Sequence, residues 1–557
     1  MRALIPTRGR SALIAATLAY AAITVAVFHN LLPSMATALY SGIDDPLLNT
    51  SILAWNAKHV PLTAAWWNFP DYAPLSGVTA WGDHLLVAYP LTSPLVWGTG
   101  NPVIAYNTLL LICFVMNGVA MFMLAREVTG SAAAAFVGGL AFAFAPYQAG
   151  QVAHVQMLIA FGMPLALFGL HRFMAGSPRA GLMWFTCGSL AVAFANGYIL
   201  MFFPLLALLW FVWFARTRWQ PLLPLAGAAI AVAVAAAPLL WGYHVRQRAY
   251  GLSRNYDEIK VFGAPLVTLG AVAHQNLVWR NVLTTTQIES SLFPGLAIVV
   301  LSGIGVAAHA RRAWQRRDAI AFYAIGALIM WSIALGPEPS WNGVSRVPYG
   351  PYRLLLLVPG VNAIRVPARA WLVAVLCLAV TAAAGAELLL RRRRTRWLAV
   401  VLSAVVLAEG AFADTIVRVP AVVPRDLIPA GALVLDLPIG AVSDNMPAVY
   451  SAVMNGYRTI NGYSGYGPPH LPVLREALAA HQPVAFDALR RLDDLYVVVR
   501  PELEAPFLRW MTAQPDLARL FESRMWTVYK LPHFGGVPRA HLPLALPVAG
   551  APAFMIR

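Results

Sequence analysis

The sequence predicts an all-α membrane protein: a polytopic bundle of about eleven transmembrane helices, followed by a small C-terminal α/β domain. Three observations predict this fold class. Hydrophobic residues make up 59% of the 557 residues and charged residues only 11%, whereas a soluble domain carries about a quarter. The hydrophobic residues form runs long enough to cross a bilayer, and arginines cluster between alternate runs. From Val419 onward, the runs shorten to the length of strands.

The formal net charge of +16 does not indicate nucleic-acid binding, because the basic residues lie mostly in short clusters between apolar runs. Such clusters report membrane topology. The three cysteines lie within apolar runs, with no metal-ligand spacing and no disulfide framework. The sequence has no P-loop, no GxSxG motif and no HExxH motif, so an ATPase, a serine hydrolase and a zinc protease have no support.

The apolar runs define the predicted membrane spans, which are about 20 residues long. They lie at roughly 11–32, 102–125, 130–149, 155–174, 180–196, 198–215, 221–243, 292–310, 318–336, 367–390 and 397–417. The arginine clusters in alternate loops are Arg126, Arg172 with Arg179, Arg216 with Arg218, Arg311 to Arg317, and Arg391 to Arg396. The positive-inside rule places all of these clusters, and the N-terminus, in the cytoplasm. The part after Val419 then lies outside the cytoplasm.

The first run follows Arg2, Arg8 and Arg10, as a signal peptide or a signal anchor would. Ser34-Met35-Ala36 has the small residues that a signal-peptide cleavage site requires. We favour an uncleaved anchor, and either alternative leaves the chain that follows it outside the cytoplasm.

Three external segments are predicted, at 34–101, 244–291 and 337–366. The first is rich in aromatic residues, as membrane–water interfaces are, and its stretch 85–100 contains two prolines and is predicted to lie at the interface. We therefore divide the chain into a transmembrane domain, 1–418, and a small α/β domain, 419–557. In the second domain, 432–437, 495–499 and 526–529 are predicted strands, and 474–480 and 506–521 are predicted helices.

An acidic pair, Asp44-Asp45, opens the first external segment. Asp followed by Pro is a favoured helix start, so Asp45 is predicted to cap a helix that begins at Pro46. This role leaves Asp44 without a structural task beside a helix N-terminus, which favours an ionised carboxylate. Asp44 is therefore a candidate general base for an acceptor hydroxyl or amine.

A second acidic site is Asp83-His84, before the interfacial stretch. It is a candidate for orienting an acceptor or for holding a divalent cation, and the alternative is a cap for a helix that starts at Leu85. Asp71 is predicted to be a turn residue.

Eight arginines face outward in this topology, although the positive-inside bias disfavours arginine there. They are Arg246, Arg248, Arg254, Arg280, Arg346, Arg353, Arg365 and Arg369. Pro367 suits the first position of the tenth span, which would place Arg365 and Arg369 around a helix N-terminus, a favourable site for phosphate. Anionic lipid headgroups and loop packing are the alternatives.

The segment 461–470 is rich in turn formers and aromatic residues. Tyr463 and Tyr466 are candidates for stacking on a sugar, and the alternative is a tightly packed loop.

On these residues the chain resembles the GT-C class of membrane glycosyltransferases, which use sugars linked to polyprenyl phosphate. Asp44-Asp45 matches the acidic pair of that class, whose first member is the catalytic base. The segments 45–50, 362–369 and 461–466 are similar to uncharacterised bacterial members. The Arg-Tyr that often follows the acidic pair is absent, and Leu47-Leu48 lies nearby instead.

The resemblance implies an inverting glycosyltransferase of the bacterial inner membrane, with its C-terminal domain in the periplasm. Its donor would be a polyprenyl-phosphate-linked sugar, and its acceptor an extracytoplasmic glycan, lipid or protein. Asp44, Asp45 and Asp83 would be catalytic. The substrate would be bound by His84, Arg246, Arg248, Arg353, Arg365, Arg369, Tyr463 and Tyr466. The sequence is also compatible with a bound divalent cation. Two alternative functions are a non-enzymatic lipid-glycan transporter and an envelope-assembly scaffold.

Overall fold

The computed structural model describes residues 7–214, 222–283, 289–316, 318–341, 343–391 and 397–534. The arginines at 216, 218 and 317, and those within 392–396, lie outside the described residues. The chain divides into two compact units. Unit 1 comprises Met1–Ser34, Asn107–Pro238 and Arg254–Thr415, and unit 2 comprises Met35–Tyr106, Leu239–Ser253 and Ile416–Arg557. The sequence boundary at residue 418 stays a prediction.

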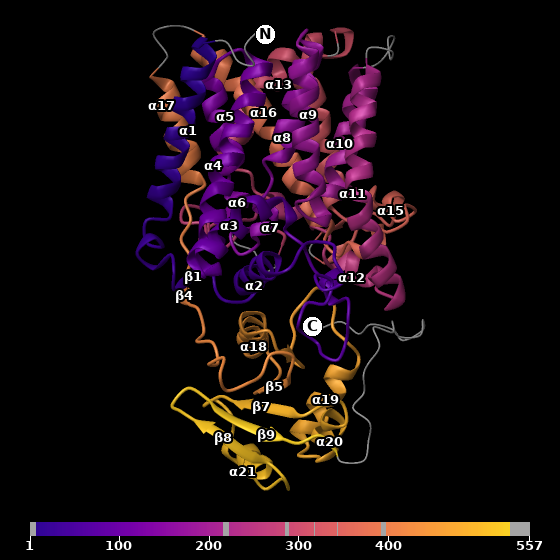
Figure 1. The fold of residues 1–557 in the computed structure, drawn as a ribbon. Coiled ribbons are helices and arrows are strands. Elements are labelled where there is room, and N and C mark those ends of the chain that lie inside the picture. The colour runs from indigo at the N-terminus through magenta and orange to yellow at the C-terminus, as the bar shows by residue number, and fades with distance from the viewer. Residues whose placement is uncertain are drawn as a thin grey trace. The chain divides into compact units, whose positions relative to one another are not determined.

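Every predicted span contains a helix (Figure 1). These helices are α1 (Thr7–Val27), α4 (Pro102–Thr129), α5 (Ala132–Ala143), α8 (Gly162–Met174), α9 (Pro178–Ala193), α10 (Gly197–Phe214), α11 (Leu223–Ala249), α13 (Leu296–Arg316), α14 (Ala319–Ala334), α16 (Trp371–Leu390) and α17 (Leu398–Glu409). Among the described residues, seven helical stretches are long and apolar enough to cross a membrane. Shorter apolar helices lie at Leu296–Ala310, Ala319–Ala334 and Leu398–Glu409.

Two predicted spans are each divided between two helices. The span 130–149 consists of α5 and α6 (Pro146–Ala149), and the span 155–174 consists of α7 (Val155–Leu158) and α8. Pro146 has no backbone N–H to donate, which suits the first turn of α6 and interrupts a continuous helix.

The last span ends earlier than predicted, at Glu409 instead of residue 417. The carboxylate of Glu409 accepts hydrogen bonds from the backbone N–H groups of Leu296, at 2.9 Å, and Ala297, at 2.8 Å. These groups lie at the N-terminus of α13, where unpaired N–H groups favour a carboxylate. The end of α17 therefore serves to cap a neighbouring helix.

Helices α13 and α16 lie side by side and approach each other closely through small residues. A Cβ added to Gly305 of α13 would overlap the carbonyl oxygen of Thr381 in α16. Hydrogen bonds of 3.0 Å join Ser302 Oγ to the carbonyl of Leu378 and Thr381 Oγ1 to Ser302 Oγ. Small residues and cross-helix hydroxyl bonds of this kind stabilise helix pairs in a membrane.

We expect Gly305→Ala to destabilise this helix pair by about 1–3 kcal/mol, because the added methyl group must displace backbone. Gly303→Ala is the matched control, since Gly303 lies in the same helix and has open space around it. Thermal unfolding of the purified protein in detergent measures both variants. Equal stability of the two would contradict the close contact.

In unit 2, a five-stranded sheet has the order β6-β5-β7-β9-β8. The strands are β5 (Leu433–Leu437), β6 (Arg458–Thr459), β7 (Leu495–Val499), β8 (Ala518–Glu522) and β9 (Thr527–Leu531). β5 pairs in parallel with β6 and β7, whereas β9 runs antiparallel to β7 and β8. The three predicted strands are confirmed as β5, β7 and β9.

Helices cover both faces of this sheet. Leu433, Leu435 and Val497 face the helices α19 (His470–Ala479), α20 (Val484–Arg490) and α21 (Ala505–Thr512). Val434 and Val498 face the opposite side, where Ala452 of α18 (Val442–Asn455) packs. The small α/β architecture predicted for this part of the chain is confirmed.

The predicted helix 506–521 is correct only in its first half, because β8 follows α21. β8 is an edge strand whose side chains are mostly exposed. Without a buried face, its sequence lacks the alternation that identifies strands.

The first external segment pairs with the C-terminal part of unit 2 at two places. β1 (Ala38–Tyr40) pairs antiparallel with β4 (Ile416–Arg418). Further on, the N–H of Thr459 donates to the carbonyl of Pro70 at 2.8 Å, and the N–H of Ala73 donates to the carbonyl of Thr459 at 2.8 Å. The first external segment and the residues after Thr415 therefore fold together.

Candidate functional site

Helix α2 (Asp45–Lys58) begins one residue earlier than predicted. Asp45 is its first residue, and Asp44 occupies the N-cap position without a capping hydrogen bond from its side chain. The predicted cap by Asp45 is therefore wrong. Asp-Pro marks the start of the helix correctly, but Pro46 tolerates either of the first two helical positions.

The side chain of Asp44 is exposed. Partial burial and the adjacent charge of Asp45 raise the pKa of Asp44 above its ordinary value. A carboxylate with a raised pKa is a stronger base, and an exposed one can be reached by a substrate. Asp44 thus has the properties expected of a general base.

Asp45 is held by a distant tyrosine, since the hydroxyl of Tyr463 donates to Asp45 Oδ1 at 2.8 Å. Tyr463 follows Asn461, which is fully buried and fixes this loop to the sheet. The amide of Asn461 accepts from the N–H of Asp436 and donates to its carbonyl, both at 2.9 Å. The acidic pair is therefore anchored to the C-terminal part of unit 2.

Asp71 and Asp83 both line a small cavity of about 20 Å³, together with Tyr463. Asp71 is 2% exposed, and its Oδ1 has no hydrogen-bond partner among the described residues. Burial raises the pKa of Asp71 well above its ordinary value, although hydrogen bonds from backbone groups, including that of Tyr463, oppose the shift. The cavity has room for about one water molecule.

The sequence predicted Asp71 only as a turn residue, so this buried carboxylate was missed. A carboxylate next to aromatic and apolar residues in the segment Phe69-Pro70-Asp71-Tyr72 is the signal that the sequence offered.

The alternative role considered for Asp83, a cap for a helix that starts at Leu85, is wrong. No helix begins at Leu85, which has a left-handed backbone (φ 50°) before the short helix η3 (Leu86–Ala88). The next residue, His84, is 5% exposed, and its Nδ1 accepts from the N–H of Leu86 at 3.2 Å. Burial lowers the pKa of His84 to about 4, so the ring is neutral at pH 7. His84 is thus placed to fix this segment.

Arg246 and Arg248 lie in the last turn of α11. The guanidinium carbon of Arg246 lies 4.1 Å from the ring centroid of Trp67, a cation–π contact, and Arg248 is exposed. Nearby, the hydroxyl of Tyr243 donates to the carbonyl of Gly82 at 2.7 Å. This end of α11 therefore positions the residues just before Asp83.

Tyr466 is 5% exposed and packs in a hydrophobic cluster. The members of this cluster are Tyr72, Val78, Trp81, Leu252, Tyr466 and Leu471. The contacts of Tyr466 match the tightly packed loop that was the alternative to sugar stacking.

In unit 1, Arg369 forms a two-pronged ion pair with Glu289. Both side chains are buried, and the guanidinium carbon of Arg369 lies 4.4 Å from the ring centroid of Tyr198. Burial favours a raised pKa for Glu289, but Arg369, His154 and Arg365 outweigh it and lower the pKa to about 2. The charge of Arg369 is therefore neutralised by a residue that the sequence did not single out.

Arg365 is half-buried just before the short helix η7 (Pro367–Ala370), which leads into α16. Its Nε is buried and has no hydrogen-bond partner among the described residues. Arg353 is exposed and donates to the carbonyl of Pro348 at 3.1 Å. Of Arg365 and Arg369, the two arginines predicted around this helix start, Arg365 keeps an Nε–H without a protein acceptor in the described chain, and its guanidinium carbon lies 4.8 Å from the ring centroid of Phe262.

Within the described part of the chain, no group of three or more His, Cys, Asp or Glu side chains is arranged to hold a metal ion.

A family model described as "Domain of unknown function (DUF6311)" matches residues 103–409. No curated protein matches the chain. Three of the solved structures that are similar to it are described here. The arabinofuranosyltransferase AftD from mycobacteria has a TM-score of 0.53 and 14% identity, over 93% of this chain and 41% of that one.

The oligosaccharyltransferase AglB from Archaeoglobus fulgidus has a TM-score of 0.50 and 13% identity, over 90% of this chain and 70% of that one. ArnT from Cupriavidus metallidurans has a TM-score of 0.48 and 11% identity, over 92% of this chain and 97% of that one. The chain thus spans 41% of the length of AftD. The likeness shows the fold, and the predicted GT-C-like fold is confirmed.

Proposed function

The chain belongs to the DUF6311 family, a domain of unknown function, and we propose that it is a membrane glycosyltransferase. Its donor would be a sugar on a polyprenyl phosphate, and its acceptor a lipid, glycan or protein outside the cytoplasm. The exposed Asp44 at the start of α2, in a GT-C-like fold, is the observation that carries this proposal. AglB was solved with a dolichol-phosphate, which supports a lipid phosphate as the leaving group.

The proposed reaction is a single displacement with inversion. The acceptor oxygen attacks the anomeric carbon while Asp44 takes the proton of that hydroxyl. The bond between this carbon and the phosphate oxygen breaks, and the lipid phosphate leaves with the electron pair. Partial burial and the charge of Asp45 raise the basicity of Asp44, and Tyr463 keeps Asp45 in place. Asp83, beside Asp71, would position the acceptor.

Arg365 is the proposed ligand of the departing phosphate. Its buried Nε has no partner among the described residues, and guanidinium groups bind phosphate with charge-assisted hydrogen bonds. Arg369, paired with Glu289, would position this segment. The exposed Arg248 and Arg353 would attract the anionic donor or its membrane surface.

We expect Arg365→Met to lower kcat/KM for the donor about ten- to hundred-fold, since a hydrogen bond to a charged group contributes about 1.5–3 kcal/mol. Arg346→Met is the control, because Arg346 is an exposed arginine of the same external segment. Initial rates at varied donor concentration measure the effect. Equal losses in both variants would remove Arg365 from phosphate binding.

The experiment that tests the proposed function compares envelope glycans by mass spectrometry in cells with and without the chain. A transferase predicts that one glycan loses a single sugar and that the lipid-linked donor accumulates. A transporter predicts that a complete lipid-linked glycan accumulates, with no sugar missing from it. A scaffold predicts loss of an assembly while both lipid-linked species stay unchanged.

We also propose that the protein lies in a bacterial inner membrane, with the N-terminus in the cytoplasm and the part after Val419 in the periplasm. The arginine clusters between alternate helices support this topology.

A further inference from the structure

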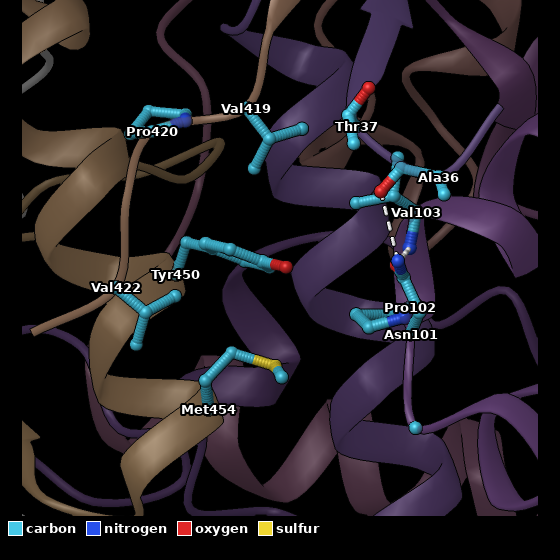
Figure 2. Close-up of a pocket in the computed structure, with 11 residues that line it drawn as sticks. Ala36, Thr37, Asn101, Pro102, Val103, Val419, Pro420, Val422, Tyr450 and Met454 are labelled. Atoms are coloured by element: carbon cyan, nitrogen blue, oxygen red, sulfur yellow. Dashed lines mark hydrogen bonds between the residues drawn. The ribbon is translucent and has the colours of Figure 1, made fainter. Parts of the chain in front are cut away.

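Two of the cavities in unit 2 differ in the charge of their lining. The larger, of about 340 Å³, is lined by 11 uncharged residues, among them Asn101, Tyr450 and Met454 (Figure 2). The smaller, of about 20 Å³, is lined by two carboxylates, Asp71 and Asp83, together with neutral residues. Because a buried charge needs a matching partner, the smaller cavity is the one that selects a class of ligand.

Asp71 lies on the buried side of the smaller cavity. It is 2% exposed, and its Oδ1 has no hydrogen-bond partner among the described residues. A carboxylate in such surroundings is neutralised either by a proton or by a cation. Burial raises the pKa of Asp71 well above its ordinary value, as expected of a carboxylate that has no cation beside it. Among the described residues that line the cavity, none is Lys, Arg or His.

Three of the side-chain donors around the cavity are committed to other acceptors. The carbonyl of Trp66 accepts from both Trp55 Nε1 and Thr79 Oγ1, each at 2.8 Å. The hydroxyl of Tyr463 donates to Asp45. The cavity therefore offers mainly acceptor oxygens, and a matching ligand brings its own N–H or O–H donors.

The size and the walls of the cavity narrow the ligand further. There is room for about one water molecule, so a divalent metal ion would not fit together with the water ligands that Mg²⁺ keeps. The aromatic side chains of Trp55 and Phe69, which are 8% and 7% exposed, form part of the wall. Aromatic rings beside carboxylates favour a primary ammonium group, which is similar in size to a water molecule and has three N–H donors.

The opposite side of the cavity is accessible to a substrate. It is formed by Asp83, Tyr463 and Ser464, which are only half-buried. This side is close to the acidic pair, because Tyr463 also binds Asp45, and Leu48, one turn further along α2, lines the cavity. A molecule with an ammonium group in the cavity would therefore extend toward the candidate base.

We propose that this cavity binds one primary ammonium group, held between Asp71 and Asp83, and that the sugar acceptor carries this group. Binding of the ammonium group does not depend on transferase activity, whereas its assignment to the acceptor rests on the proposed function. Lipids with an ethanolamine headgroup, peptides with lysine and amino sugars all share this chemistry.

The first test measures binding of radiolabelled methylammonium to the purified full chain in detergent, by equilibrium dialysis. We expect saturable binding of one methylammonium per chain, with displacement by ethanolamine. Tetramethylammonium, which is larger than the cavity, and potassium, which has no N–H donors, should not displace the probe. Absence of saturable binding, or equal displacement by potassium, would overturn the proposal. These comparisons use the native protein and decide the matter even if a variant fails to fold.

Asp71→Asn keeps the shape of the side chain and removes its charge. It should weaken methylammonium binding about ten- to hundred-fold, the usual effect of losing a hydrogen bond between charged groups, and Asp83→Asn should show a loss of the same order. Glu502→Gln is the matched control, because Glu502 is an exposed carboxylate of the same unit. Unchanged binding in Asp71→Asn, or an equal loss in the control, would exclude the cavity as the site.

A kinetic measurement identifies the substrate that carries the ammonium group. Methylammonium is expected to inhibit sugar transfer competitively with respect to the acceptor but not the donor. Competition with the donor, or no inhibition at concentrations that saturate the cavity, would overturn the assignment to the acceptor. A chain that binds methylammonium but transfers no sugar would contradict the proposed function and this assignment, and would still support the ammonium site.

Discussion

Asp44→Asn is expected to lower the rate of sugar transfer by about 10²–10⁴-fold, the usual contribution of a general base. Asparagine keeps the size of the side chain but cannot accept the acceptor's proton. Because Asp44 is exposed and makes no capping hydrogen bond, its replacement should leave the fold intact. Initial rates with a purified donor measure the loss, and protein yield and melting temperature should match the native protein.

Asp257→Asn is the matched control for this variant. Asp257 is also an exposed carboxylate in the first turn of a helix, α12 (Tyr256–Val261), and the proposed mechanism does not use it. Full activity of Asp44→Asn, or an equal loss in Asp257→Asn, would exclude Asp44 as the base.

The pH dependence gives a second readout of the same role. Burial and the charge of Asp45 raise the pKa of Asp44, so the acidic limb of kcat/KM should lie above the range of an ordinary aspartate. Below that limb Asp44 is protonated and cannot act as a base. Asp45→Asn removes the neighbouring charge, which should lower the pKa of Asp44 and move the limb to lower pH. An unmoved limb would assign it to another group.

The acidic pair could be recognised from sequence because its signals are local. An Asp-Pro helix start and a position just after an apolar run need only a few neighbouring residues. The partner of Asp45 could not be recognised, because Tyr463 lies 418 residues away. Asp71 was missed for a related reason: whether a carboxylate is buried depends on residues that fold around it from other parts of the chain.

The membrane helices were predictable because apolar runs of sufficient length have few alternatives. Departures occurred where a side chain acts outside its own helix. Glu409 ends α17 early because it caps α13. The strand β8 was taken for a helix because its exposed side chains leave no alternating pattern. Local sequence thus predicts elements with a buried face, but not elements whose role is set by a neighbour.

Arg369 shows the same limit at the candidate anion site. The sequence placed it with Arg365 as a phosphate ligand, on the basis of a helix start at Pro367. The structure pairs it with Glu289, which lies in another external segment. The spacing of charges along the chain cannot reveal which arginine is already neutralised.

Arg369→Met is therefore expected to act mainly on stability, with a loss of about 3–5 kcal/mol, because it leaves Glu289 buried without its partner. Arg391→Met is the control: its ion pair with Glu387 is exposed, and such pairs contribute about 0–1 kcal/mol. Thermal unfolding in detergent measures both variants.

The double variant Arg369→Met with Glu289→Met separates the two roles of this pair. Replacing both members of a buried ion pair by apolar residues is often neutral, so stability should return. If the double variant regains stability but not donor binding, Arg369 also contacts the phosphate. If it regains both, Arg369 acts by positioning alone.

The stability that the Glu289 carboxylate confers on the native protein should also depend on pH. The pKa of Glu289 is lowered to about 2, so this stabilisation is present above the pKa of a free glutamate and is lost as the pH falls toward 2.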